Sequence, residues 1–281
     1  MHGLIEYFTN ISTQERSLML IGGLVFLLTI ETFIPQYQMK YQKLKHGATN
    51  ILFTVITLVI NLFGAILIIK AVKFNEINNF GVLNMFSLPI WLSIPIGIAI
   101  MDLIGAWLIH WLEHTVKWMW RFHLIHHTDP YVDATTGLRH HPGENVFRLL
   151  FTILAIMISG ASLGLVMMYQ TISVFFAHLT HANIKIPFSI DKVISYIFVT
   201  PQFHKVHHHY TQPYTDSNYG NIFSFWDHCF GTAKNFHSLK NLVYGIDTHM
   251  KPKEHSNLIN LLLIPFQPYR EPLNQNKNQN K

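Results

Sequence analysis

The run LPIWLSIPIGIAIMDLIGAWLI, residues 88–109, leads without a break into HWLEH, residues 110–114. A helix of about 20 apolar residues is long enough to cross the hydrocarbon core of a bilayer. His110 and His114 are four residues apart, so a helix places both side chains on one face, one turn from each other. Together the two stretches predict a membrane span that ends in a pair of potential metal ligands.

The composition agrees with a membrane protein. Hydrophobic residues make up 49% of the chain and charged residues only 12%, whereas an ordinary soluble domain carries about 25% charged residues. The single cysteine, Cys229, excludes an internal disulfide framework and a metal site built from cysteines. The net charge of +5 is small and scattered, so we expect no nucleic-acid partner.

Four apolar stretches mark the spans, at residues 18–34, 51–69, 88–109 and 149–176. The first three each fit one crossing. The fourth is longer and has Gly160 and Gly164 near its middle, so it is either one tilted span or a helical hairpin. We therefore predict an all-α integral membrane bundle with three or four hydrophobic spans, or a hairpin, and a cytoplasmic histidine-rich helical cap.

The loops suggest an orientation and a domain plan. Basic residues follow the first and third spans, namely Lys40, Lys43, Lys45, Lys117, Arg121, Arg139 and Arg148. By the positive-inside rule these loops are cytoplasmic and the N-terminus lies outside. We expect one membrane-embedded domain over residues 1–272, with its core at 102–232, and a disordered polar tail at 273–281.

Histidine is the unusual feature of the sequence. Of 19 histidines, 13 lie between His110 and His209, mostly in tight groups. Four groups carry ten candidate metal ligands: His110, His114, His123, His126, His127, His178, His181, His204, His207 and His208. Spacings of three and four residues favour one helical face, so an i, i+3, i+4 triple can hold one ion and reach toward a second.

Ten imidazoles exceed what one zinc ion takes, which is about four ligands. The number fits two ions of higher coordination number. Imidazole binds iron, copper, nickel and zinc, so the ligand type alone does not identify the metal. Two other functions could also use histidine ligands in a membrane protein. HWLEH has the His-x-x-Glu-His pattern of inverted zinc peptidases, but that reading leaves HLIHH and HKVHHH unexplained. A membrane metal transporter would place its ligands within the spans, whereas these ligands cluster outside the apolar stretches.

The ordered set HWLEH, WRFHLIHH, RHHPGE, HLTHAN, TPQFHKVHHHY, DSNYG and WDHCFGT resembles the fatty acid hydroxylase superfamily. The likeness is greatest to the bacterial sterol desaturase branch, which is similar to alkylglycerol monooxygenase, and it covers residues 102–232. It implies a non-haem di-iron oxidoreductase that uses O2 to hydroxylate or desaturate a C–H bond of a membrane lipid, be it sterol, fatty acyl chain or ether lipid.

The resemblance also implies roles for single residues. Eight of the ten histidines fall on the family's metal ligands, while His178 and His181 fall on a more variable pair. His141, Glu144, Asp102, Asp227 and His209 are expected to support the ligands from outside or to face the substrate.

Cofactors and partners follow from the same likeness. We expect two iron ions and O2 as co-substrate, with zinc able to replace iron on overexpression because it binds nitrogen sites more tightly. We also expect a lipid substrate and a separate electron donor of the ferredoxin, cytochrome or flavin reductase type. The expected location is a bacterial inner membrane, with the metal site facing the cytoplasm.

Overall fold

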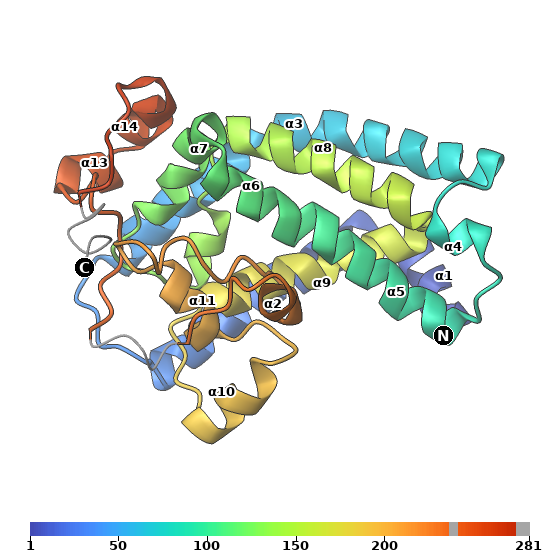
Figure 1. Cartoon of the computed structure of the whole chain (residues 1–281), viewed down its shortest axis with the longest axis horizontal. Helices are drawn as coiled ribbons and strands as arrows, with labels where there is room; N and C mark the ends of the chain where they lie inside the picture. Colours follow the sequence, from blue (N-terminus) through green and yellow to red (C-terminus); the bar gives the residue numbers. More distant parts are fainter. Residues whose placement is uncertain (236–240, 274–281) are drawn as a thin grey trace.

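The computed structural model describes residues 1–235 and 241–273, and every regular element in those ranges is a helix (Figure 1). Three isolated β-bridges are the only strand-like pairings in that part of the chain. The expected polar tail, apart from Leu273, lies outside the described residues. The prediction of an all-α protein is confirmed.

Five helices are long and apolar enough to cross a membrane. They are α2 (Thr13–Phe33), α3 (Lys43–Asn78), α8 (Pro142–Ser159), α9 (Leu163–His181), and one continuous helix formed by α5 (Ile90–Asp102), the π-helical segment η1 (Leu103–Leu108) and α6 (Ile109–Thr115). Their outer faces stay apolar and exposed, as at Leu62 and Phe63 of α3. The chain is an integral membrane helical bundle.

The fourth apolar stretch forms a helical hairpin, which raises the number of candidate spans to five. Helix α8 ends at Gly160, whose φ of +72° is the left-handed conformation that glycine adopts without strain. The chain then reverses and α9 begins at Leu163. Of the two alternatives that the sequence left open, the structure has the hairpin.

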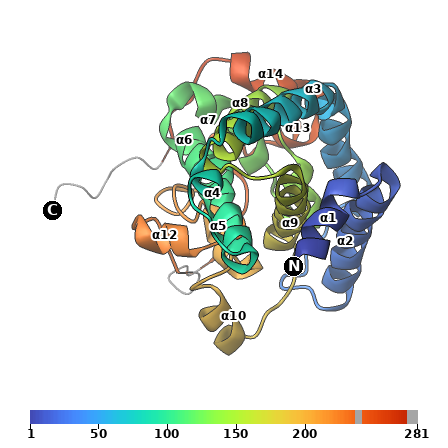
Figure 2. The same ribbon diagram turned by 90° about the vertical axis from the view of Figure 1, so that its right-hand side faces the viewer.

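The spans pack around a core of small and aliphatic side chains. Met101 of α5, Ile156 of α8, and Leu165 and Tyr169 of α9 are all buried in one cluster. The Tyr169 hydroxyl donates a hydrogen bond to the Met101 carbonyl at 3.1 Å. The short helices α1 (His2–Asn10) and α4 (Val82–Met85) lie at one end of this bundle, near the N-terminus (Figures 1 and 2).

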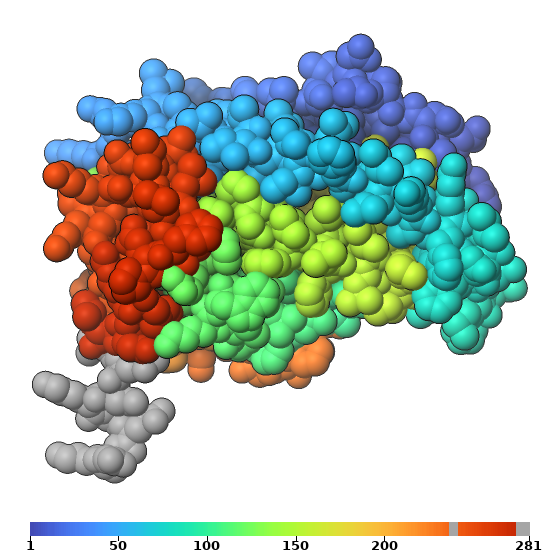
Figure 3. Space-filling view, turned by 90° about the horizontal axis from the view of Figure 1, so that it is seen from above, coloured from blue at the N-terminus to red at the C-terminus, as the bar shows by residue number. Residues whose placement is uncertain are grey.

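The histidine-bearing helices gather at the opposite end. This end holds α7 (Lys117–His127), η2 (Ala134–Leu138), α10 (Phe188–Ile194), α11 (Pro201–His207) and α12 (Phe225–Cys229). The segment α13 (Pro252–Ser256), α14 (Leu258–Leu263) and η4 (Ile264–Phe266) folds back over it, so that α14 and η4 cover α3 and α7 in the view from above (Figure 3). Phe53 of α3 and Ile125 of α7 are fully buried in one cluster with Leu261 of α14.

Chain direction accounts for this arrangement. The helices α2, the α5–α6 rod and α9 all run toward the histidine end, while α3 and α8 start there (Figure 1). The basic segments that follow the first and third spans therefore lie at the same end of the molecule as the histidines, as the positive-inside argument requires.

We predict that Gly81→Ala destabilises the bundle. Gly81 has a φ of +95°, and a Cβ built there would lie 2.4 Å from the Cα and N of Gly160 at the α8–α9 turn. Backbone strain of this kind costs ~1–3 kcal/mol before the clash is counted. The midpoint of thermal unfolding in detergent should fall by more than about 4 °C.

The matched control is Gly22→Ala in α2, where an added Cβ meets nothing within 4 Å. Alanine favours the helix by about 1 kcal/mol over glycine, so this variant should keep or gain stability. Equal midpoints for the two variants would contradict the close approach of Gly81 to the hairpin turn.

Candidate metal centre

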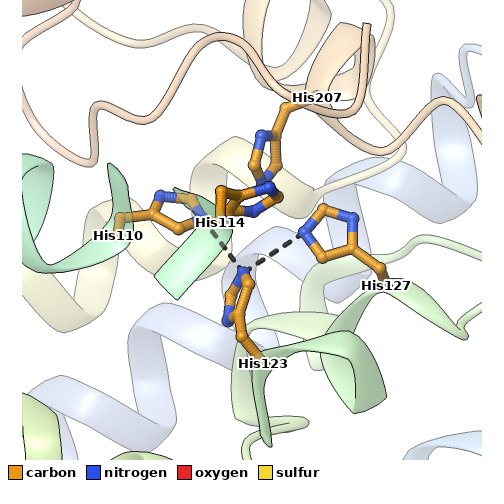
Figure 4. Close-up of side chains that lie close together, drawn as sticks. All are labelled: His110, His114, His123, His127 and His207. Atoms are coloured by element: carbon orange, nitrogen blue, oxygen red, sulfur yellow. Dashed lines mark hydrogen bonds between the residues drawn. The ribbon is translucent and has the colours of Figure 1, made fainter. Parts of the chain in front are cut away.

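The α5–α6 rod delivers the first histidine pair. A π-helical segment, residues 103–108, immediately precedes His110, and such segments shift the phase of a helix and often occur at functional sites. His110 and His114 then stand one turn apart on α6, with His110 buried and the His114 side chain fully covered. Both rings point toward α7 and α11 (Figure 4).

Each HxxHH motif divides its three imidazoles between two neighbouring groups. On α7, His123 and His127 enter group one, while His126 enters group two. On α11 and its C-cap residue the division is reversed. His207 enters group one, whereas His204 and His208 enter group two. Residues four apart share a face, so the i, i+4 members stay together and the remaining histidine turns aside.

Group one consists of five imidazoles whose ligand atoms lie within 4.8 Å of one another: His110, His114, His123, His127 and His207. The Nε2 of His123 lies 3.1 Å from Nε2 of His110 and 3.2 Å from Nε2 of His127. Figure 4 shows the five rings converging on a common centre from three directions. Three separate helices thus supply one group.

Group two consists of four buried imidazoles: His126, His181, His204 and His208. Their Nε2 atoms converge on that of His181, at 3.0 Å from His126, 3.2 Å from His204 and 3.0 Å from His208. His181 is the last residue of α9, so a membrane span ends directly in this group.

The two groups contact each other through their rings. The ring centroids of His127 and His208 are 4.8 Å apart, and those of His204 and His207 are 5.0 Å apart. In each pair one ring belongs to group one and the other to group two. Two ions held in these groups would be close neighbours with no other side chain needed between them.

Hydrogen bonds outside group one fix which nitrogen of each ring carries the proton. The Nδ1 atoms of His110 and His207 donate to the carbonyls of Tyr219 at 2.8 Å and Ser217 at 2.7 Å. A carbonyl can only accept, so in these neutral rings the inward Nε2 is left with a lone pair.

Two carboxylates do the same for two of the three other rings of group one. His123 Nδ1 lies 2.8 Å from Glu144, and His114 Nδ1 lies 3.0 Å from Asp216. This carboxylate–histidine arrangement is the usual support for an imidazole that binds a metal. Four lone pairs of group one therefore face its centre.

This donor set fits a cation in each group. The Nε2 atoms of His114 and His207 are buried and have no hydrogen-bond partner among the described residues. In group two, His181 donates through Nδ1 to the Ala177 carbonyl at 2.6 Å. Its Nε2 therefore has a single lone pair, which cannot accept three good hydrogen bonds at once. A positive ion at each centre would satisfy all of these atoms.

Burial keeps the imidazoles of α7 and α11 neutral, which is the protonation state that metal binding needs. Loss of hydration lowers the pKa of His126, His127 and His207 well below the usual value, and the surrounding imidazoles lower it further. Burial likewise lowers the pKa of His204 to about 3. These rings are neutral at pH 7 and ready to donate a lone pair.

A charged network supports His123 from behind. Glu144 accepts from His123, from His140 Nδ1 at 2.7 Å and from Arg148 Nε at 2.9 Å. Arg148 also pairs with Glu113 at 2.5 Å, and both carboxylate side chains are fully buried. Glu113 thus lies on the Nδ1 side of His123, behind the ring and away from the Nε2 atoms that face group one.

The sequence pattern does not identify His140 and favours His141, the second histidine of RHHPGE. The His140 ring stacks on His126 at 4.6 Å and 11°, and forms a compact set with His123 and Glu144. Its ring connects the network behind group one with a ring of group two. Its distance of 13 residues from the HLIHH motif gave no spacing signal that could have identified it.

Three expected histidines stand outside both groups. His178 donates through Nδ1 to the Ala134 carbonyl at 3.0 Å. His141 is the N-cap of α8, where its Nδ1 accepts the Gly143 N–H at 2.9 Å. His209 Nδ1 accepts the Val243 N–H at 3.3 Å.

Asp102 and Asp227 lie one step further from the imidazoles than expected. Asp227 accepts the N–H groups of Tyr219 and Gly220 at 2.8 and 2.9 Å. Asp102 accepts the N–H groups of Ile222 and Phe223 in the same loop, both at 3.2 Å. The two carboxylates hold the loop whose Tyr219 carbonyl orients His110.

Residues 94–232, which contain both groups, match the family model described as fatty acid hydroxylase. The chain contains a fatty acid hydroxylase domain. No solved structure matches it.

Curated relatives of the chain include two proteins with only partial overlap. Ornithine lipid hydroxylase OlsE of Rhizobium tropici is 26% identical over 147 residues, 52% of this chain and 43% of that protein. Human alkylglycerol monooxygenase is 28% identical over 174 residues, 59% of this chain and 36% of that protein. The chain spans less than half the length of both relatives.

A third relative matches along most of its length. Methylsterol monooxygenase 2-2 of Arabidopsis thaliana is 24% identical over 233 residues, 81% of this chain and 86% of that protein. All three relatives are named as lipid hydroxylases or monooxygenases. The match to OlsE lends limited support to the bacterial branch that the sequence suggested.

We predict that Glu144→Gln weakens metal retention more than Asp216→Asn. Glu144 is fully buried and holds three donors, whereas the Asp216 side chain is 36% exposed, so water can replace its contact. Loss of a carboxylate behind a ligand costs roughly 10- to 100-fold in metal affinity. The measurement is the metal left per chain after dialysis against a graded series of chelator concentrations.

The control is Glu271→Gln, a surface partner of Lys117 that is 67% exposed and should behave as wild type. If Glu144→Gln also retained metal like wild type, the tautomer argument for group one would be wrong.

Proposed function

We propose that the chain is an O2-dependent, non-haem di-iron lipid hydroxylase. The observation that carries the proposal is the pair of abutting, buried imidazole groups at the end of the membrane spans. One ion in each group would use nine of the ten histidines expected to bind metal, His178 being the exception. Iron is proposed because family relatives are named as hydroxylases and monooxygenases.

The proposed substrate is a membrane lipid, and hydroxylation is favoured over desaturation. Relatives act, by their names, on an ornithine lipid, a methylsterol and an alkylglycerol, which share an alkyl portion and little else. All three names describe oxygen insertion. Helix α9 ends in His181, so an alkyl chain lying along the span could approach group two without leaving an apolar environment.

Two iron ions would supply the electrons and the binding site needed to activate O2 for attack on an unactivated C–H bond. The chain itself binds and orients. Nine imidazoles hold the ions, and Glu144, Asp216 and the loop carbonyls at 217 and 219 keep the Nδ1 protons of group one outward. Complete burial of His123, His127 and His207 excludes bulk water.

The remaining features complete the proposal. The whole region 1–272 would act as one domain, because the C-terminal segment α13–η4 packs on α7 and α3. The histidine end would face the cytoplasm of a bacterial inner membrane, where the basic loops gather. A separate ferredoxin, cytochrome or flavin reductase would deliver electrons there, and zinc could replace iron on overexpression.

The position of Glu113 disfavours the zinc peptidase alternative. A peptidase would need this carboxylate beside a metal-bound water. Here it is held by Arg148 on the outer side of His123. The transporter alternative is disfavoured by the gathering of ligands at one end of the bundle rather than midway along it.

The test uses protein purified in mild detergent from iron-supplemented cells and returned to lipid. Wild type should hold close to two irons per chain and, with a chemical or enzymatic reductant, convert lipid to a product heavier by one oxygen that derives from O2. His207→Ala and His204→Ala each remove one proposed ligand from a different group. Each should lower iron content and abolish the product.

The matched control is His2→Ala, an exposed histidine on α1 at the opposite end of the bundle, which should retain iron and product. One tightly held zinc that survives His204→Ala but is lost in His114→Ala would contradict the proposal. Unchanged product in both ligand variants would also contradict it.

A further inference from the structure

The segment of residues 188–198, which comprises α10 and the turn after it, exposes an unusual amount of apolar surface. Val193 is 70% exposed and Ile197 is 54% exposed. Further exposed apolar side chains in this segment are Phe188, Ile190, Ile194, Tyr196 and Phe198. Contiguous exposed patches of this kind on a folded protein mark contact with a partner or a membrane.

The segment lies at the edge of the bundle, toward the histidine end. Figure 1 shows α10 projecting from the body near α11, and Figure 2, which looks along the spans, shows it at the periphery. The segment thus extends sideways from the bundle rather than capping its end.

Ring contacts place the segment at the depth of a span. Phe198 lies 6.1 Å from the ring of Phe176 on α9 and 5.6 Å from that of Phe223. Phe176 is five residues before His181, inside the candidate span Leu163–His181, which is ~7.5 Å along the helix. The apolar segment therefore ends beside a helix that is itself long and apolar enough to lie in lipid.

We infer that residues 188–198 insert into the lipid bilayer beside α9. At seven residues α10 is far too short to cross, so it would lie at the interface with its apolar side chains among the acyl chains. Part of its backbone is paired locally, as where the Ser195 N–H donates to the Asp191 carbonyl at 2.8 Å, which lowers the cost of contact with lipid. The exposed side chains of Lys185 and Lys192 can extend to the headgroups.

Lipid fits this surface better than a protein partner because the apolar surface continues onto the spans. Helix α2, which packs on α9, exposes apolar side chains such as Phe26 at 57%, and this surface already requires lipid around it. The segment also links two ligand-bearing helices, since it follows His181 and precedes α11 with His204. Its insertion would fix the depth of group two just beneath the membrane surface.

The experiment measures the depth of single labelled positions in the full chain, reconstituted in vesicles. In a Cys229→Ser background, Val193→Cys is labelled with bimane and exposed to nitroxide-bearing phospholipids or to aqueous iodide. Leu62→Cys on α3 serves as the lipid reference, and Lys253→Cys, on exposed α13, as the aqueous reference.

We expect the label at 193 to be quenched by the lipid nitroxide at least half as strongly as at 62, most by a nitroxide near the headgroup, and to resist iodide. Quenching by iodide to the extent seen at 253 would overturn the inference. Protection from both quenchers would also overturn it and would indicate a protein partner or second copy. The readout needs no activity, so it can fail while the proposed function holds.

Discussion

The structure depends on nitrogen lone pairs that face one another inside a protein. In group one, outward hydrogen bonds to two carbonyls and two carboxylates commit four rings to presenting Nε2 inward. In group two, three Nε2 atoms approach the single lone pair of His181. Such an arrangement is repulsive without a cation and favourable with one, so metal binding and folding of the cap are linked. The shared ions would add to the apolar contacts that already hold α7 through Leu124 and Ile125 and α11 through Phe203 and Val206.

The bundle explains how chain segments so distant in sequence meet. Three spans run toward the same end, and two of them, the α5–α6 rod and α9, end in ligand histidines. The loops that follow supply α7 and α11, whose HxxHH motifs each contribute to both groups. One helix carrying an i, i+3, i+4 triple is therefore enough to couple two ions. The membrane sets where the spans end, and the helical period sets which ion each histidine meets.

Much of this was predictable from the sequence, and the failures have physical reasons. Helical spacing placed nine of the ten expected ligands in the two groups, because i, i+4 neighbours must share a face. His178 is the exception. It lies three residues before His181 in HLTH, and its Nδ1 donates a hydrogen bond to the Ala134 carbonyl of η2, so its ring lies outside both groups. The sequence could not choose between a span and a hairpin at 149–176, since that depends on how Gly160 meets Gly81. It also could not rank the carboxylates or identify His140, because Asp216 meets His114 and His140 meets His126 only through tertiary contacts.

The central claim is that two ions occupy two separate imidazole groups. Anomalous diffraction at the iron absorption edge, from crystals of the iron-loaded protein, tests it most directly. We expect two peaks per chain, one among His110, His114, His123, His127 and His207, and one among His126, His181, His204 and His208. A single peak, or a second peak ligated by His178 away from group two, would contradict it.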